Sequence, residues 1–235
     1  PFNSSDEEVY TFLNEFSPTM GITPQNSFND YSLGFTFGDQ YELKNGHKLG
    51  VLLAGNYKNN TVLFDDAFFG EYQNDRNTSI TEFQRAATSE GSLTERDVLL
   101  GGLAGVAYKT KNSKYKLNYM RLMNGVSRSA DFELIDDDSA IGKSGYSGIS
   151  ENMEYNERKV DNLFFGGENH FNQDEWVVDY RASTTWSSQE DPDIRRTAFT
   201  RFGNDDRLRF VGGAAGNPSR LWRSLEEVNI GGKID

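Results

Sequence analysis

Segments in which apolar and polar residues alternate recur along this chain, and this pattern restricts its fold more than any other feature. Residues 31–38 show the pattern as an apolar set followed by a small or polar set: Tyr31, Leu33, Phe35 and Phe37, then Ser32, Gly34, Thr36 and Gly38. Successive side chains of a β-strand point to opposite faces, so this segment has one apolar face and one small or polar face. Six such segments occur, separated by gaps that are alternately short and long. Long strands with this spacing predict the wall of a transmembrane β-barrel.

The alternation predicts six strands and the opening of a seventh, over about 28–38, 47–57, 96–109, 114–123, 158–171, 175–187 and 229–234. Tight turns are expected at Asn45-Gly46, which is a strong hairpin signal, and at residues 111–113 and 172–174. The polar segments 58–95, 124–157 and 188–227 are expected to be long loops. The expected fold is therefore an all-β, antiparallel, up-and-down barrel wall with short periplasmic turns and long extracellular loops.

The first 27 residues read differently from the rest of the chain. Ser5 with Glu8 three positions later fits a capping box, and apolar residues follow at helical spacing. We expect a short helix over about 6–16 that stops before Pro18. Residues 1–27 are accordingly interpreted as a loop with a short helix, part of an extracellular loop, and residues 28–235 as a partial β-barrel segment.

Composition restricts the class of protein further. The chain has 36% hydrophobic residues, 23 glycines and 13% aromatic residues, a combination that suits a wall with one face in lipid and one in water. There is no run of 18 apolar residues, which excludes a membrane-spanning helix. Cysteine is absent, so disulfides and thiolate chemistry are excluded. A net charge of −12 argues against a nucleic-acid partner.

Two tryptophans mark the edges of the expected membrane band. Trp176 and Trp186 lie ten residues apart on the same face of one strand. With about 3.3 Å per residue and a tilt of about 45°, they are separated by roughly 23 Å along the membrane normal. This is close to the apolar band of about 25 Å that aromatic girdles flank in outer-membrane barrels. The alternative is that these aromatics belong to the core of a soluble β-protein.

No catalytic constellation is present, so we expect neither an enzyme nor a bound cofactor. His47 and His170 both fall at short-turn ends of strands, where a single histidine is typically solvated or interfacial rather than a metal ligand. No histidine, aspartate and serine occur at a spacing that would support nucleophilic catalysis. Catalytic and metal-binding residues are therefore expected to be absent, and the ligand-binding residues stay unassigned.

The polar segments carry unequal charge. Segment 58–95 has seven acidic and three basic residues, and segment 124–157 has eight and two, including Asp136, Asp137 and Asp138. This acidic triplet is either a Ca²⁺ site or, more typically for adjacent carboxylates, a solvated loop tip. Segment 188–235 has eight of each sign, including Arg195, Arg196, Arg220 and Arg223. Such arginines either bind plug carboxylates and lipopolysaccharide phosphates or form salt bridges within the segment.

Aromatic residues in the polar segments also allow two interpretations. They either stack on a sugar or peptide ligand or pack the segments against one another: Phe64, Phe68, Phe69, Tyr72, Tyr146 and Tyr155. Small and polar residues opposite the apolar face are expected to line a lumen or contact a plug: Ser32, Thr36, Asn56, Asp179 and Arg181.

Several stretches resemble the barrel of TonB-dependent outer-membrane receptors, in particular the oligosaccharide and peptide importers. One is Asn26-Ser27-Phe28 followed by residues 33–38 and 48–51; another is residues 99–109. The strongest is Trp176 through Asp179-Tyr180-Arg181-Ala182-Ser183 to Gln189-Glu190-Asp191-Pro192-Asp193-Ile194-Arg195-Arg196, a strand that leaves the membrane into an acidic-Pro-Asp-x-Arg loop. Leu225-Glu226-Glu227 before Asn229 resembles the return from that loop.

This resemblance implies a segment of a larger polypeptide in the cell outer membrane. Family barrels have about twenty-two strands closed around a plug, so a chain with six or seven strands is expected to supply only part of the wall. The implied function is import of a scarce oligosaccharide, peptide or siderophore, driven through TonB. The implied partners are outer-membrane lipid and lipopolysaccharide, the plug of the same polypeptide, TonB and a surface lipoprotein lid.

Two other function classes stay open at this point. A passive porin or an assembly or adhesion barrel would share the wall but lack a globular plug. A soluble, secreted β-sandwich binding module would instead fold alone in water, with the apolar faces of two sheets packed together.

Overall fold

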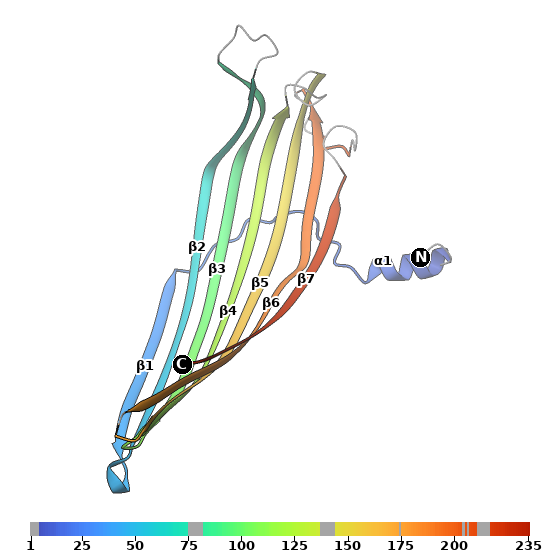
Figure 1. Cartoon of the computed structure of the whole chain (residues 1–235). Coiled ribbons are helices and arrows are strands. Elements are labelled where there is room, and N and C mark those ends of the chain that lie inside the picture. The colour runs from blue at the N-terminus through green and yellow to red at the C-terminus, as the bar shows by residue number, and fades with distance from the viewer. Residues whose placement is uncertain are drawn as a thin grey trace.

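The strands of this chain form one antiparallel sheet. The computed structural model describes residues 5–74, 82–136, 144–173, 175–203, 205, 207–210 and 217–235. Each strand pairs with its neighbours in sequence, giving the order β1 to β7 (Figure 1). The elements are α1 Asp6–Asn14, β1 Tyr31–Glu42, the 3₁₀ turn η1 Lys44–Gly46, β2 Lys48–Asn74, β3 Phe83–Lys109, β4 Ser113–Asp136, β5 Ser144–Phe171, β6 Trp176–Phe202 and β7 Ser219–Ile234.

The helix and the tight turns confirm the local sequence signals. In α1 the backbone N–H of Glu8 donates to the Ser5 hydroxyl at 3.3 Å, and the Ser5 N–H donates to the Glu8 carboxylate at 2.9 Å. The helix ends at Asn14, two residues earlier than expected. Asn45 and Gly46 take positive φ angles of 71° and 75° in the first turn, a conformation that suits these two residue types.

The expected long loops are wrong for most of their length, because the strands continue through them. Strands β2, β3 and β6 each contain 27 residues, β4 contains 24 and β5 contains 28. Segments 58–95, 124–157 and 188–227 are therefore largely β-sheet. Their side chains are polar on both faces, so they show no alternation, while hydrogen bonds to neighbouring strands still satisfy the backbone.

The segment expected to be an acidic-Pro-Asp-x-Arg loop is a β-bulge inside β6. The pairing between β6 and β7 shifts register between Asp191 and Ile194, so β6 has one extra residue there. Pro192 lies in this bulge, where its missing N–H removes no regular ladder bond. The motif thus bends a continuous strand instead of ending it.

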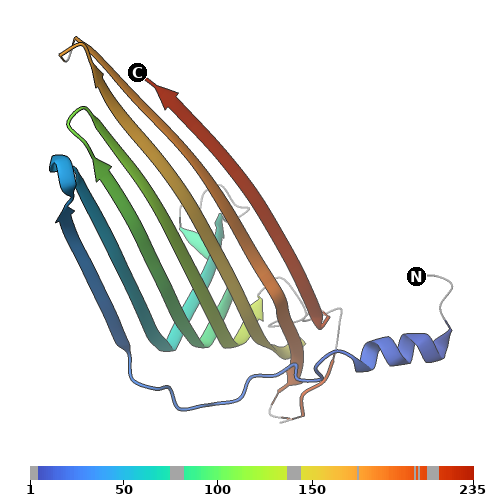
Figure 2. The ribbon, with the colours of Figure 1, turned by 90° about the horizontal axis from the view of Figure 1, so that it is seen from below.

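In the described part of the chain, the sheet is a single curved layer without a second sheet packed on it (Figure 2). Among the residues whose placement is described, Ala130 and Ile194 are the buried hydrophobic residues, with exposed fractions of 7% and 5%. A β-sandwich would bury one face of each sheet in a common core. The observed all-β sheet agrees with the expected strand order and open form, while strands β1 and β7 do not pair with each other in the described part of the chain.

Strands β3 and β4 approach each other closely at Gly91, so this position should require glycine. A methyl group at Gly91 would overlap the backbone carbonyl of Asp131 on the neighbouring strand, whereas one at Gly102 would meet no atom within 4 Å. Gly91→Ala should lower the free energy of unfolding by about 1–3 kcal/mol through overpacking. Urea titration of the full-length protein measures this change, with Gly102→Ala as the matched control. Equal effects of the two substitutions would contradict the packing argument.

Candidate membrane face and candidate ligand face

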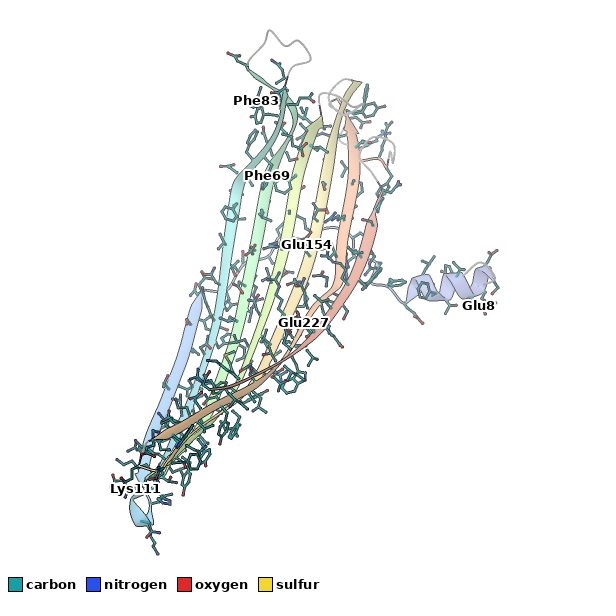
Figure 3. All side chains as sticks on the ribbon, viewed as in Figure 1. Glu8, Phe69, Phe83, Lys111, Glu154 and Glu227 are labelled. Atoms are coloured by element: carbon teal, nitrogen blue, oxygen red, sulfur yellow. The ribbon has the colours of Figure 1, made fainter. Side chains whose placement is uncertain are left out.

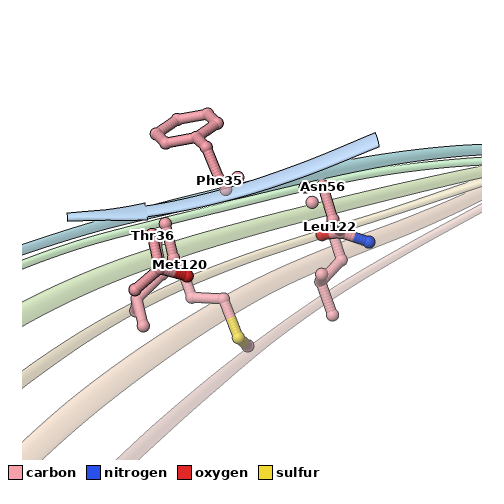
Figure 4. Close-up of a pocket in the computed structure, with 11 residues that line it drawn as sticks. Phe35, Thr36, Asn56, Met120 and Leu122 are labelled. Atoms are coloured by element: carbon pink, nitrogen blue, oxygen red, sulfur yellow. The ribbon is translucent and has the colours of Figure 1, made fainter. Parts of the chain in front are cut away.

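The register of the sheet sorts side chains into two faces. Phe35 points to one side of the sheet, while Thr36, Asn56 and Met120 point to the other (Figure 4). We call the side of Phe35 the apolar face and the opposite side the polar face. Cross-strand partners share a face, so the register assigns every regular strand position to one of the two.

A band of exposed large side chains covers the apolar face in the half of the sheet near the short turns. Its members are solvent-exposed because no other part of the described chain lies on them: Phe35, Phe37, Leu53, Leu100, Val106, Leu117, Leu163, Phe165, Trp176, Trp186, Val228 and Ile230. A soluble monomer rarely exposes so large a contiguous apolar surface. This band is the candidate membrane face.

Aromatic residues border the apolar band on both sides. Near the short turns, one cross-strand row contains four tyrosines: Tyr41, Tyr108, Tyr115 and Tyr180. At the far border Tyr31 stacks on Tyr57 with ring centroids 5.6 Å apart, and Trp186 occupies the same border on β6. The sequence predicted Trp176 and Trp186 as border residues, whereas the tyrosine row becomes visible only with the register.

Both histidines lie near the short turns and hydrogen-bond to protein groups. His47 Nδ1 lies 2.6 Å from the hydroxyl of Tyr108, and His170 Nε2 lies 2.8 Å from a carboxylate oxygen of Glu168. Across the described residues, no group of three or more histidine, aspartate or glutamate side chains has a metal-binding arrangement. Each histidine therefore has a structural partner at the strand end.

A polar pair ends the apolar band on the two central strands. Asp161 on β5 accepts a hydrogen bond from the Tyr119 hydroxyl and lies 3.7 Å from an Nη atom of Arg121 on β4. Both charged side chains are on the apolar face, directly beyond Leu163. Lys159 and Glu157 form the next ion pair along β5. The apolar surface on these strands thus changes to a charged surface at Asp161.

The polar face opposite the band carries small and polar side chains together with some exposed apolar ones, such as Leu52 and Leu122, and it has two shallow hollows. The first, of about 360 Å³, is lined by Gly34, Thr36, Asn56, Gly101 and Met120 among others (Figure 4). The second, of about 350 Å³, is lined by charged residues from β4, β5 and β6: Lys114, Lys116, Glu168, Asp179 and Arg181. The register places all five residues expected to line a lumen on this face: Ser32, Thr36, Asn56, Asp179 and Arg181.

The bulge in β6 presents one carboxylate to each face of the sheet. On the polar face, the buried Asp191 accepts hydrogen bonds from the Asn156 amide and from Arg223 Nε, the latter at 2.7 Å. On the opposite face, Asp193 accepts from Arg195 Nε at 2.9 Å and from Arg220 Nε at 2.9 Å. Arg195, Arg220 and Arg223 therefore form salt bridges within the segment, one of the two sequence interpretations, whereas Arg196 pairs with Glu154 on β5.

Asp193 also fixes an N-terminal strap, which we define as residues 15–22. Arg195 Nη1 donates to the carbonyl of Thr19 at 2.7 Å, and Arg220 Nη1 donates to that of Ser17 at 2.9 Å. The strap lies on β5 to β7, on the face that carries the apolar band. It is farther from the short turns than the band is. Phe16 in the strap packs on Trp222 with ring centroids 5.4 Å apart.

The aromatic residues of the polar segments lie in strands rather than loops. Phe69 contacts Phe132 edge to face at 5.4 Å, and Tyr146 contacts Phe202 at 4.8 Å. Phe69 and Phe83 lie toward the end of the sheet away from Lys111 (Figure 3). Two of the residues, Phe64 and Phe69, are more than half exposed on the polar face. Of the acidic triplet, Asp137 and Asp138 lie outside the described residues, so the structure does not distinguish a Ca²⁺ site from a solvated loop tip.

Comparison with known proteins gives no family assignment. No protein-family model and no curated protein sequence matches this chain. In the described part of the chain, no helix is both long and apolar enough to cross a membrane. The geometry of the two faces and the sequence motifs are therefore the features from which a function can be proposed.

Removal of the Asp193 carboxylate should release the strap. In Asp193→Asn the two guanidinium groups lose the negative charge and one of the two acceptor oxygens that orient them toward the strap carbonyls. Charge-assisted hydrogen bonds contribute about 1.5–3 kcal/mol, so amide exchange in residues 15–22 should become about 10- to 100-fold faster. Hydrogen–deuterium exchange of the full-length protein measures this rate. Asp205→Asn, which removes a pairing with Arg209 in the segment that follows β6, is the control and should leave the strap unchanged.

Acid should release the strap only at low pH. Hydrogen bonds from Arg220, and secondarily from Arg195, hold the pKa of Asp193 below its usual value against the opposing effect of burial. A lowered folded-state pKa means that the stabilisation is complete above the ordinary value of about 3.9 and is lost as the pH falls below it. Strap exchange, corrected for intrinsic rates, should be constant from about pH 5 to 8 and rise below about pH 4. A rise near pH 6 would contradict this assignment.

Proposed function

We propose that this chain is a segment of the β-barrel wall of a TonB-dependent importer in the outer membrane. The observation that carries the proposal is the exposed apolar band with aromatic borders, opposite a more polar face that includes small side chains, on seven consecutively paired strands of the described chain. Outer-membrane barrels have this arrangement, with lipid on one side and a polar interior on the other.

The dimensions of the band support a membrane position. The band on β2 extends from Leu49 to Tyr57, and on β6 from Trp176 to Trp186. At about 3.3 Å per residue and a tilt of about 45°, these stretches span roughly 19 and 23 Å along the membrane normal. Strands of 24 to 28 residues exceed the 9–11 residues that cross a bilayer, so the polar remainder would extend from the cell surface.

The importer class is favoured by the sequence motifs rather than by the sheet alone. The stretch from Trp176 to Arg196 resembles the corresponding strand of oligosaccharide and peptide importers, with its Asp-Pro-Asp motif in the β6 bulge. In this proposal the polar face contacts a plug of the same polypeptide, and the protein works with TonB and a surface lipoprotein lid. The second candidate is a passive porin or an adhesion or assembly barrel, since such proteins share the apolar band.

The position of the bilayer can be tested by placing arginine on each face. Leu117 lies in the middle of the apolar band, and Asn118 next to it lies on the polar face. If the band is in lipid, Leu117→Arg should destabilise the full-length protein by about 2–4 kcal/mol, while Asn118→Arg should have a much smaller effect. Urea titration in phospholipid vesicles measures both variants. In a soluble protein Leu117 is already half exposed, and its substitution by arginine would change stability little.

Importer and porin differ in conductance and energy dependence. A barrel closed by a plug should show no steady conductance in a planar bilayer when the full-length protein is reconstituted, whereas a porin conducts without any ligand. Cells that need the protein for growth on its nutrient should also lose that growth when TonB is deleted. Open-channel conductance, or uptake that persists without TonB, would replace the importer by the porin.

A further inference from the structure

Four exposed arginines occupy the polar face beyond the apolar band, one on each of β4 to β7. They are Arg128, Arg158, Arg223 and Arg196, and they lie on the face opposite the strap. Along the strand direction, any two of them are two to six residues apart in the register of the sheet, which is one to three positions on the same face. With strands about 4.8 Å apart and two residues spanning about 6.7 Å, neighbouring arginines are roughly 12–14 Å apart at Cα.

Carboxylates pair with three of these arginines, and they hold two of the three through Nε, which leaves the Nη edge of those two free. Glu95 accepts from Arg128 Nε at 2.6 Å, and Asp191 accepts from Arg223 Nε at 2.7 Å. Glu154 instead lies 3.6 Å from an Nη atom of Arg196, and Arg158 has no side-chain partner in the described part of the chain. The Nη atoms of Arg128 and Arg223 donate to no residue in the described part of the chain, although half or more of each side chain is exposed, 50% and 61%. These guanidinium groups are oriented but retain unused donors.

The two arginines that bind the strap show the opposite arrangement. Arg195 and Arg220 use both Nε and Nη atoms on Asp193 and on strap carbonyls, and their side chains are 19% and 16% exposed. Their donors are consumed inside the protein. The contrast indicates that the arginines on the polar face are not needed in full to stabilise the fold.

We propose that these four arginines form a binding site for an extended anionic ligand, one that presents repeated carboxylate, sulfate or phosphate groups. A guanidinium with a free Nη edge binds such groups through two parallel hydrogen bonds. The spacing of the four groups requires an oligomer rather than a single small anion. The exposed rings of Phe64 and Phe69 on the same face, farther along β2, provide a surface for the apolar side of such a chain. This inference rests on the proposed function, in which the polar face receives the imported ligand, and it names the ligand class.

The probe for this site is a pair of oligomers that differ only in charge. Sulfated dextran and unmodified dextran of equal length are titrated into the full-length protein in detergent, with fluorescence anisotropy as the readout. The sulfated oligomer should bind and weaken as salt is raised, because exposed charge pairs are screened. The uncharged oligomer should not bind. Equal binding of both oligomers, or binding of neither, would overturn the anionic class.

Variants assign the binding to these arginines. Arg158→Gln and Arg196→Gln leave no buried carboxylate unpaired, since Glu154 is one-third exposed, and each should weaken binding of the sulfated oligomer about three- to tenfold. Arg196→Lys should recover only part of the loss because lysine lacks the planar fork. Arg207→Gln, which removes a side chain that is 84% exposed outside the sheet, is the matched control and should bind normally. Unchanged binding in both variants, or the same loss in the control, would overturn the site.

The oligomer-binding test and the tests of the proposed function can fail independently of each other. The two arginine substitutions at positions 117 and 118 test the membrane position, and conductance tests the importer, without any ligand. If those tests succeed and the sulfated oligomer fails, the barrel stands and the ligand class is wrong. If the sulfated oligomer binds through Arg158 and Arg196 while the protein behaves as a porin, the site stands and the importer is wrong.

Discussion

Backbone hydrogen bonding between consecutive strands is the interaction on which this structure depends. Seven strands form one sheet, and in its described part only Ala130 and Ile194 are buried hydrophobic residues, so no packed core stabilises it. A ladder satisfies the backbone groups of interior strands but gives a small net free energy per hydrogen bond. The remaining stabilisation has to come from whatever covers the apolar band. Lipid is such a cover, because it contacts the band without competing for backbone hydrogen bonds.

Where the sheet is polar on both faces, charges rather than apolar packing set the local geometry. The bulge in β6 turns Asp191 and Asp193 to opposite faces, and each binds an arginine of β7. One extra residue thus links the strap on one face to the exposed Arg223 on the other. Asp191 is buried with its arginine exposed, so loss of Arg223 would leave a desolvated carboxylate without its main partner.

The sequence predicted the half of the sheet near the short turns well, because the two faces differ in polarity there and the sequence alternates with a period of two. The turns at Asn45-Gly46 and at residues 111–113 and the helix cap at Ser5 were also correct, since each depends on local chemistry. The half away from the short turns was mistaken for loops because both faces are largely polar there and the sequence shows no alternation. The row of Tyr41, Tyr108, Tyr115 and Tyr180 was missed for another reason: residues of four strands form a row only when the register is known. The arginines on the polar face follow the same rule.

The two edges of the sheet add a final constraint to the proposed membrane position. Strands β1 and β7 each have one neighbour in the described chain, so the outer N–H and C=O groups of both strands lack ladder partners within the sheet. Each such group in hydrocarbon costs several kcal/mol, and the band on β1 alone covers residues 31–41. A sheet with this apolar band is therefore compatible with lipid only if further strands pair with both edges. Closure into a barrel satisfies both edges at once, and it turns the face with the glycines and the free guanidinium groups inward, toward water and ligand.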